Sequence, residues 1–167
     1  MKNAPRWGGS PERLQLLELY RQVDALLEGW TCACSRAGVD GVPEVPCCHF
    51  AVTGREPYPT AVELEEVRHA IRAAPPARLD PKHLPMAELR PCPLLSKDGR
   101  CRIYASRPFG CRTFFCDDAE APFGAKKRLP RDEVNALGRR VADLSAKFAP
   151  RDPGPRPLVK ALGGQGK

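Results

Sequence analysis

The sequence predicts a small, mostly helical single domain with irregular, metal-stapled loops and little β structure. Three observations support this fold class. Apolar residues recur at helical spacing in three segments, 19 prolines and 14 glycines interrupt the chain, and eight cysteines fall in close groupings. With 167 residues, of which 42% are hydrophobic and 28% charged, the chain has the length and composition of one globular domain.

The first helix is predicted from Pro11 to Leu27. Ser10 is a natural N-cap, Pro11 suits the first helical position, and Gly29 suits the end of the helix. Its apolar residues form one face, so we expect a core helix; they are Leu16, Leu19, Tyr20, Val23, Leu26 and Leu27.

A second helix is predicted to start at Thr60, which has capping-box spacing to Glu63, and to end near Pro75. Glu63, Glu65 and Glu66 lie near its start, where acidic groups suit the helix dipole without any catalytic role. A third helix is predicted from Asp132 to Phe148, because apolar residues recur there three or four positions apart.

The remaining segments are predicted to be loops. Residues 29–58 hold the first four cysteines, residues 75–91 are proline-rich, and residues 92–116 hold the other four. Asp98 and Gly99 predict a tight turn, followed by a short strand at Arg102–Tyr104. The predicted organisation is a flexible N-terminus at 1–9, a cysteine-cluster domain at 10–148, and a flexible basic tail at 149–167.

Charge and hydropathy restrict the function classes. The net charge is +7, but residues 1–9 supply +2 and residues 149–167 supply +3, so much of the excess lies at the ends. Without a helix-turn-helix, RNP or zinc-finger spacing, this distribution argues against nucleic-acid binding. No segment is apolar enough for a signal peptide or a membrane span, so we expect a cytoplasmic protein that does not bind membranes.

The cysteines are the candidate metal ligands. Thiolates bind zinc and iron–sulfur clusters, usually four at a time, and clustered cysteines in a reducing cytosol favour metal binding over structural disulfides. The sequence therefore predicts a metal ion as partner and either zinc or an iron–sulfur cluster as cofactor. The candidates are Cys32, Cys34, Cys47, Cys48, Cys92, Cys101, Cys111 and Cys116.

Metal binding is not the sole role open to the cysteines. An exported protein would use them in disulfides, and one or two thiols would be explained as small buried hydrophobes. His49, next to Cys48, is a further candidate ligand, whereas a single catalytic cysteine would leave seven unexplained. Residues 92–116 carry a local charge of +4, which suits a negatively charged thiolate site but also fits a solvated surface.

Residues 92–116 resemble the YkgJ-like cysteine-cluster family of zinc- or iron-chelating proteins. The residues that carry this resemblance are Cys92-Pro93-Leu94, Gly99-Arg100-Cys101-Arg102-Ile103-Tyr104, Arg107-Pro108 and Cys111-Arg112-Thr113-Phe114. The first half is similar too, with a leading helix, a group ending in Cys47-Cys48, and a capped helix. The family's first group is compact, whereas here a long insertion separates Cys34 from Cys47.

The resemblance implies metal binding rather than a known reaction. Cys92, Cys101, Cys111 and Cys116 are then the leading ligands, Arg107 and Arg112 would support the thiolates, and Tyr104 would be a packing residue. A similar region in flagellin lysine methylases implies an alternative: an iron–sulfur enzyme or electron carrier, with a protein-modifying activity. The sequence does not decide whether the protein is an enzyme, and it identifies no protein partner.

Overall fold

The computed structural model describes residues 7–31, 46–74, 92–96, 98–115, 121–122 and 129–163. Within these ranges the protein is mostly helical, and extended pairing occurs as isolated bridges, such as the antiparallel bridge between Leu95 and Cys101. The fold class predicted from the sequence is therefore confirmed. None of the helices in the described ranges is long and apolar enough to cross a bilayer.

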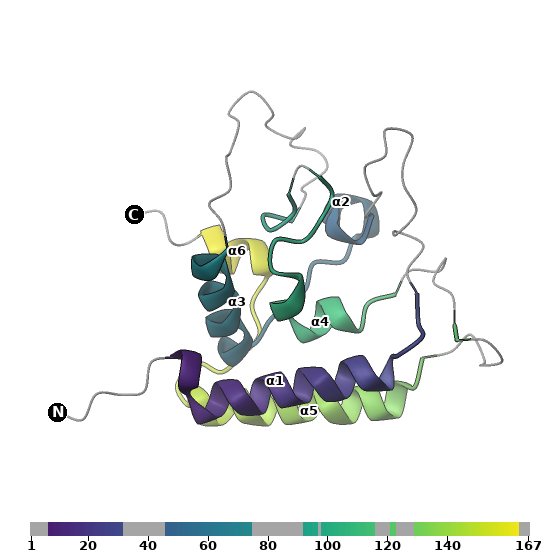
Figure 1. The fold of residues 1–167 in the computed structure, drawn as a ribbon. Coiled ribbons are helices and arrows are strands. Elements are labelled where there is room, and N and C mark those ends of the chain that lie inside the picture. The colour runs from purple at the N-terminus through teal and green to yellow at the C-terminus, as the bar shows by residue number, and fades with distance from the viewer. Residues whose placement is uncertain are drawn as a thin grey trace.

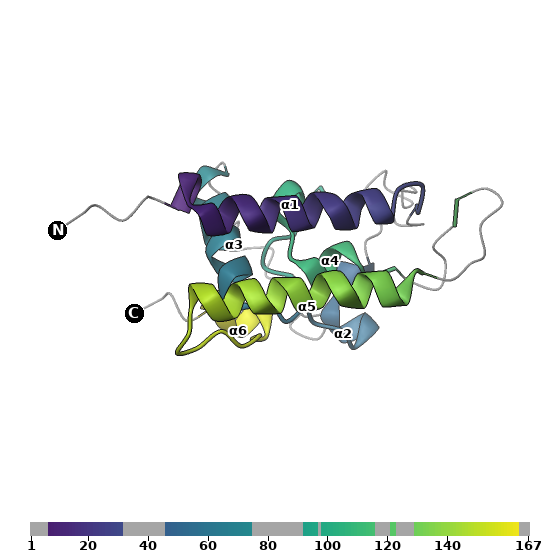
Figure 2. The same ribbon diagram turned by 90° about the horizontal axis from the view of Figure 1, so that it is seen from below.

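Two long helices form one side of the molecule. Helix α1 spans Pro11–Leu26 and helix α5 spans Arg131–Phe148; they lie side by side and run in opposite directions (Figures 1 and 2). The Ser10 hydroxyl caps α1 by accepting a hydrogen bond of 3.1 Å from the Arg13 backbone N–H. These helices match the sequence predictions to within one residue at each end.

Helix α3, Ala61–Ala73, runs across this pair and joins the two parts of the core (Figure 1). The Glu63 carboxylate accepts a hydrogen bond of 2.8 Å from the Thr60 backbone N–H, which is a contact of the predicted capping box. It also accepts a hydrogen bond of 2.9 Å from the Thr60 hydroxyl. Val62 belongs to the core beneath α1 and α5, whereas Leu64 and Val67 belong to a second core.

Each core is a cluster of buried apolar side chains. The first joins α1, α3 and α5, and consists of Leu16, Leu19, Tyr20, Val62, Val141 and Leu144. The second lies under the cysteine-bearing segments and consists of Phe50, Leu64, Val67, Leu94, Ile103 and Leu158.

Short elements complete the fold. Their bounds are Trp7–Gly9 (η1), Pro46–Cys48 (η3), Phe50–Thr53 (α2), Tyr104–Ser106 (η4), Phe109–Arg112 (α4) and Leu158–Gly163 (α6). In isolation these short elements would be only marginally stable, because a helix of one or two turns does not repay its nucleation cost.

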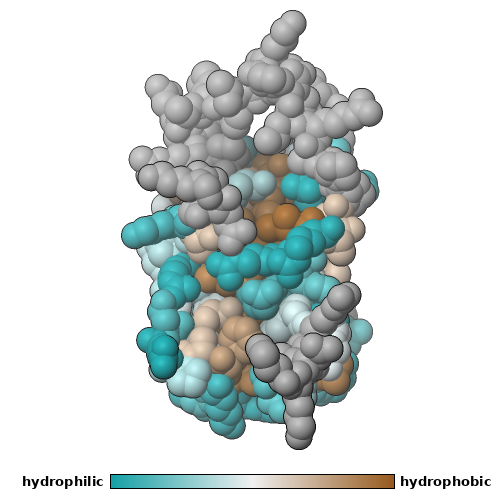
Figure 3. Space-filling model, turned by 90° about the vertical axis from the view of Figure 1, so that its left-hand side faces the viewer, coloured by the Kyte–Doolittle hydropathy of each residue, from teal (hydrophilic) through white to brown (hydrophobic). Residues whose placement is uncertain are grey.

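On the face shown in Figure 3, hydrophobic residues form patches on either side of a hydrophilic band.

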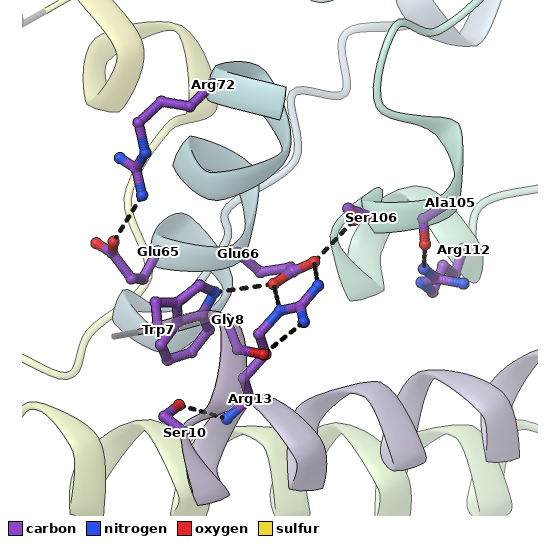
Figure 4. A network of polar contacts seen from close by, with 10 residues as sticks. All are labelled: Trp7, Gly8, Ser10, Arg13, Glu65, Glu66, Arg72, Ala105, Ser106 and Arg112. Carbon is purple, nitrogen blue, oxygen red and sulfur yellow. Dashed lines mark hydrogen bonds and ion pairs between the residues drawn. The ribbon is translucent and has the colours of Figure 1, made fainter. Parts of the chain in front are cut away.

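Glu66 is a buried polar centre of the fold (Figure 4). Its carboxylate accepts hydrogen bonds from Trp7 Nε1 at 2.8 Å, Arg13 Nε at 2.7 Å and Ser106 Oγ at 2.8 Å, which ties η1, α1 and η4 to α3. Burial raises the pKa of Glu66, but these hydrogen bonds outweigh burial and hold the pKa below its ordinary value. The helix-dipole interpretation of this residue is therefore incomplete.

Three sequence predictions need correction. Arg102–Tyr104 is not a strand, because residues 102–103 form a turn that leads into η4. Residues 149–163 are not a flexible tail, since α6 docks Leu158, which is 1% exposed, into the second core. Trp7 is also held in place, by a ring contact of 5.3 Å with Phe148. Residues 1–6 and 164–167 lie outside the described ranges.

Candidate metal centre

Cys47 and Cys48 lie on η3, immediately before α2. Phe50, in the first position of α2, is 9% exposed and anchors this segment in the second core. The Cys48 carbonyl accepts a hydrogen bond of 2.7 Å from the Cys92 backbone N–H. Backbone pairing therefore holds this group against the start of the next cysteine segment, 44 positions later in the numbering of the chain.

A tight turn brings Cys92 and Cys101 to the same side of the second core. The Ser96 N–H donates to the Arg100 carbonyl at 2.9 Å, and Gly99 adopts a φ of 72°, which glycine accommodates without strain. The bridge between Leu95 and Cys101 closes the turn. The predicted Asp98–Gly99 turn is thus confirmed, and the cysteines on either side of it both pack against the second core.

Cys111 lies on α4, which buried polar contacts hold against α1 and α3. The Phe109 N–H at the start of α4 donates to Glu63 Oε1 at 2.7 Å. Arg112, 5% exposed, contacts Asp24 of α1 at 2.5 Å and lies 4.0 Å over the ring of Tyr20. It also donates to the backbone carbonyl of Ala105 (Figure 4) and to that of Arg107 at 2.9 Å. Arg112 therefore fastens the segment that positions Cys111.

The three segments converge on one pocket of about 970 Å³. Its lining includes the five cysteines of the described ranges: Cys47, Cys48, Cys92, Cys101 and Cys111. Residues far apart in the sequence thus face a single space, as a ligand set drawn from separate loops would require.

Burial is the main influence on the thiols. It raises the pKa of Cys92 to about 11 and that of Cys111 to about 12, and it raises the pKa of Cys101 as well. Neighbouring thiols contribute: Cys47 and Cys101 act on Cys92, and Cys92 and Cys101 act on Cys111. Four cysteines are therefore electrostatically coupled, and the three with raised pKa values are neutral thiols at neutral pH.

Arg107 is the cation that faces this group. Its charge lowers the pKa of Cys101 and of Cys111, although burial outweighs it in both cases. Its guanidinium lies 4.0 Å over the Tyr104 ring. Tyr104 is 65% exposed, so its predicted packing role is limited to this contact and to the pocket wall.

The structure describes only part of the predicted ligand set. Cys32, Cys34 and Cys116 lie outside the described ranges. His49 does not line the pocket, and its buried Nδ1 has no hydrogen-bond partner among the described residues. In the same ranges, no group of three or more Cys, His, Asp or Glu side chains has the spacing needed to hold a metal ion.

The pocket also contains residues that the sequence interpretation did not select. Trp30 and Phe115 form part of the wall, with ring centroids 5.6 Å apart, and Leu158 reaches it from α6. Only the Phe114-Phe115 pair, next to the last cysteines, gave a local signal of an apolar wall. No local sequence signal predicted that α6 contributes to the pocket wall, because this short helix follows a proline-rich segment.

Comparison with known proteins adds no assignment. No protein-family model, no curated protein and no solved structure matches this chain. The resemblance to the YkgJ-like family therefore stays an expectation, drawn from the pattern of residues between Cys92 and Phe114 and from the similar order of the first half.

Proposed function

We propose that this protein binds a metal, as a zinc ion or an iron–sulfur cluster, through its cysteine thiolates. The observation that carries the proposal is the convergence of cysteines from η3, from the 92–101 turn and from α4 on one pocket. Buried hydrophobic cysteines would not need to meet in this way. A metal site does need it, because its ligands must come from all sides.

The donor chemistry fits both candidate metals. Cys47, Cys48, Cys92, Cys101 and Cys111 all line the pocket, and Cys92 and Cys101 both influence the pKa of Cys111. Binding would require these side chains to approach one another and to lose their protons, since the thiolate is the ligand form. The bound metal would then cross-link three segments that contain only short turns and that otherwise meet through the second core and a few hydrogen bonds.

The test is metal, sulfide and visible-spectrum analysis of the full chain, purified anaerobically, with Cys92→Ser, Cys101→Ser and Cys111→Ser as variants. We expect stoichiometric zinc without colour, or iron and sulfide with visible absorbance, and loss of the metal in all three variants. An iron–sulfur result would direct attention to an electron carrier or enzyme.

Leu94→Ala is the matched control, because Leu94 lies between Cys92 and Cys101 and is 4% exposed. It should cost about 2–5 kcal/mol of stability and keep the metal, since it removes packing but no ligand. Protein that is metal-free when prepared from metal-supplemented cells, or cysteine variants with full metal content, would contradict the proposal.

A further inference from the structure

The pocket beside the cysteines has the dimensions and walls of a small-molecule site. Its volume of about 970 Å³ is in the upper part of the range for ligand pockets. On one wall the ring centroids of Trp30 and Phe115 lie 5.6 Å apart, and Ile103 and Leu158 supply aliphatic surface. Such walls accommodate an apolar or aromatic body, which gains free energy when it leaves water.

Two arginines of the pocket are placed to receive an anion. Arg55 lies 5.4 Å from the centre of the Phe114 ring and Arg107 lies 4.0 Å from that of Tyr104, so aromatic faces orient both guanidinium groups. The Nε of Arg107 is buried and has no hydrogen-bond partner among the described residues. A buried donor left in this state is costly unless a partner reaches it.

The acidic groups of the pocket are already engaged. Asp24 contacts Arg112 at 2.5 Å and lies farther from Arg107, at 3.9 Å, while Glu56 accepts a hydrogen bond of 2.6 Å from the Val159 N–H. Arginines outnumber acidic residues among the described residues of the lining, and they are Arg55, Arg100, Arg107 and Arg112. The described lining therefore carries an excess of positive charge, which favours an organic anion over an organic cation.

We propose that this pocket binds a small organic anion, with its apolar body against the aromatic wall and its acidic group held by Arg55 and Arg107. Guanidinium groups suit this task because they form paired, charge-assisted hydrogen bonds with planar acidic groups. The proposal does not depend on which metal the cysteines bind.

Two fluorescent probes with the same ring system separate charge from hydrophobicity. Anilinonaphthalene sulfonate is anionic, and phenylnaphthylamine is its neutral counterpart. We expect the sulfonate to bind the anaerobically purified full chain with a lower Kd than the neutral probe. Arg55→Gln and Arg107→Gln should each raise the Kd of the sulfonate by about tenfold, the effect of losing one charge-assisted hydrogen bond, and leave the neutral probe unchanged.

Arg140→Gln is the control variant, because Arg140 lies on α5 away from the pocket and donates to Gln22 at 2.7 Å. It should leave both Kd values unchanged. Equal binding of the two probes, an equal loss in all three arginine variants, or no binding of the sulfonate would overturn the proposal. A cooperative thermal transition must accompany binding, since this class of dye also binds partly folded chains.

Metal content, measured on each preparation, separates anion binding from metal binding. Anion binding by a metal-free chain would support the pocket and contradict the metal centre. A metal-loaded chain that binds the sulfonate no better than the neutral probe would support the metal centre and contradict the anion site.

Discussion

The α1–α5 pair and the cysteine-bearing segments, meaning residues 46–53, 92–96 and 98–115, are built on different principles. The helices have 16 and 18 residues, with apolar faces that bury Leu16, Val23 and Val141 almost completely. The cysteine-bearing segments contain only single helical turns, tight turns and an isolated β-bridge. Their apolar anchors, Phe50, Leu94 and Ile103, dock on a core that α3 and α6 complete.

This difference shows where additional cross-links have most effect. A long amphipathic helix gains stability from its own hydrogen bonds and from one continuous buried face. A segment of single turns has few internal hydrogen bonds, so its stability depends on its contacts with the rest of the protein. Metal binding would therefore supply a cross-link where local structure is weakest.

The largest expected effect follows metal removal. Structural zinc can contribute on the order of 10 kcal/mol to the folding of a small metal-dependent unit, and this stabilisation would be concentrated in the cysteine-bearing segments. Trp30 lies in the pocket, whereas Trp7 packs on Phe148 beside α5. A chelator should therefore change the fluorescence of a Trp7→Phe variant, which retains Trp30, and have little effect on Trp30→Phe. An equal response in both variants would show that the two regions unfold as one unit.

The next effect concerns the polar link between the two regions. Glu66→Ala leaves Arg13, Trp7 and Ser106 without their shared acceptor, and should lower the free energy of unfolding by about 3 kcal/mol. Glu65→Ala is the matched control on the same helix. Its partners Arg68 and Arg72 are partly exposed, so it should cost less than about 1 kcal/mol. Urea denaturation followed by circular dichroism measures both, and similar losses would refute the special position of Glu66.

A comparable test concerns α6. Leu158→Ala should destabilise the protein by about 2–3 kcal/mol, because Leu158 is 1% exposed and fills the second core. Val159→Ala changes the adjacent residue, which is 42% exposed, and should have an effect within about 0.5 kcal/mol. Equal stability of both variants in urea would restore the interpretation of residues 149–163 as a tail.

The smallest expected effect is a pH dependence. The pKa of Glu66 is lowered from its ordinary value of 4.5 in the folded protein, so its contribution to stability is present above that pH. The contribution is lost as the pH falls through the folded pKa. Stability in urea should therefore decline less steeply between about pH 5 and about pH 3 for Glu66→Gln than for the parent chain. An unchanged slope in Glu66→Gln would contradict this assignment.

Sequence patterns alone are enough to predict the three long helices and the turn at Asp98–Gly99. Their signals are local: Ser10 and Thr60 cap helices whose apolar residues recur at helical spacing, and Gly99 supplies a positive φ. The sequence also singled out the cysteines as a chemical group, because residue type can be read without knowledge of the fold.

Which of these residues lie close together depends on long-range packing, which local sequence patterns do not reveal. The docking of Leu158, the burial of Glu66 and the approach of Cys47, Cys92 and Cys111 all join positions far apart in the chain. Short elements such as α4 and α6 have too few residues to show a period. Their positions follow from the packing of α1, α3 and α5, which provides the surfaces on which these short segments dock.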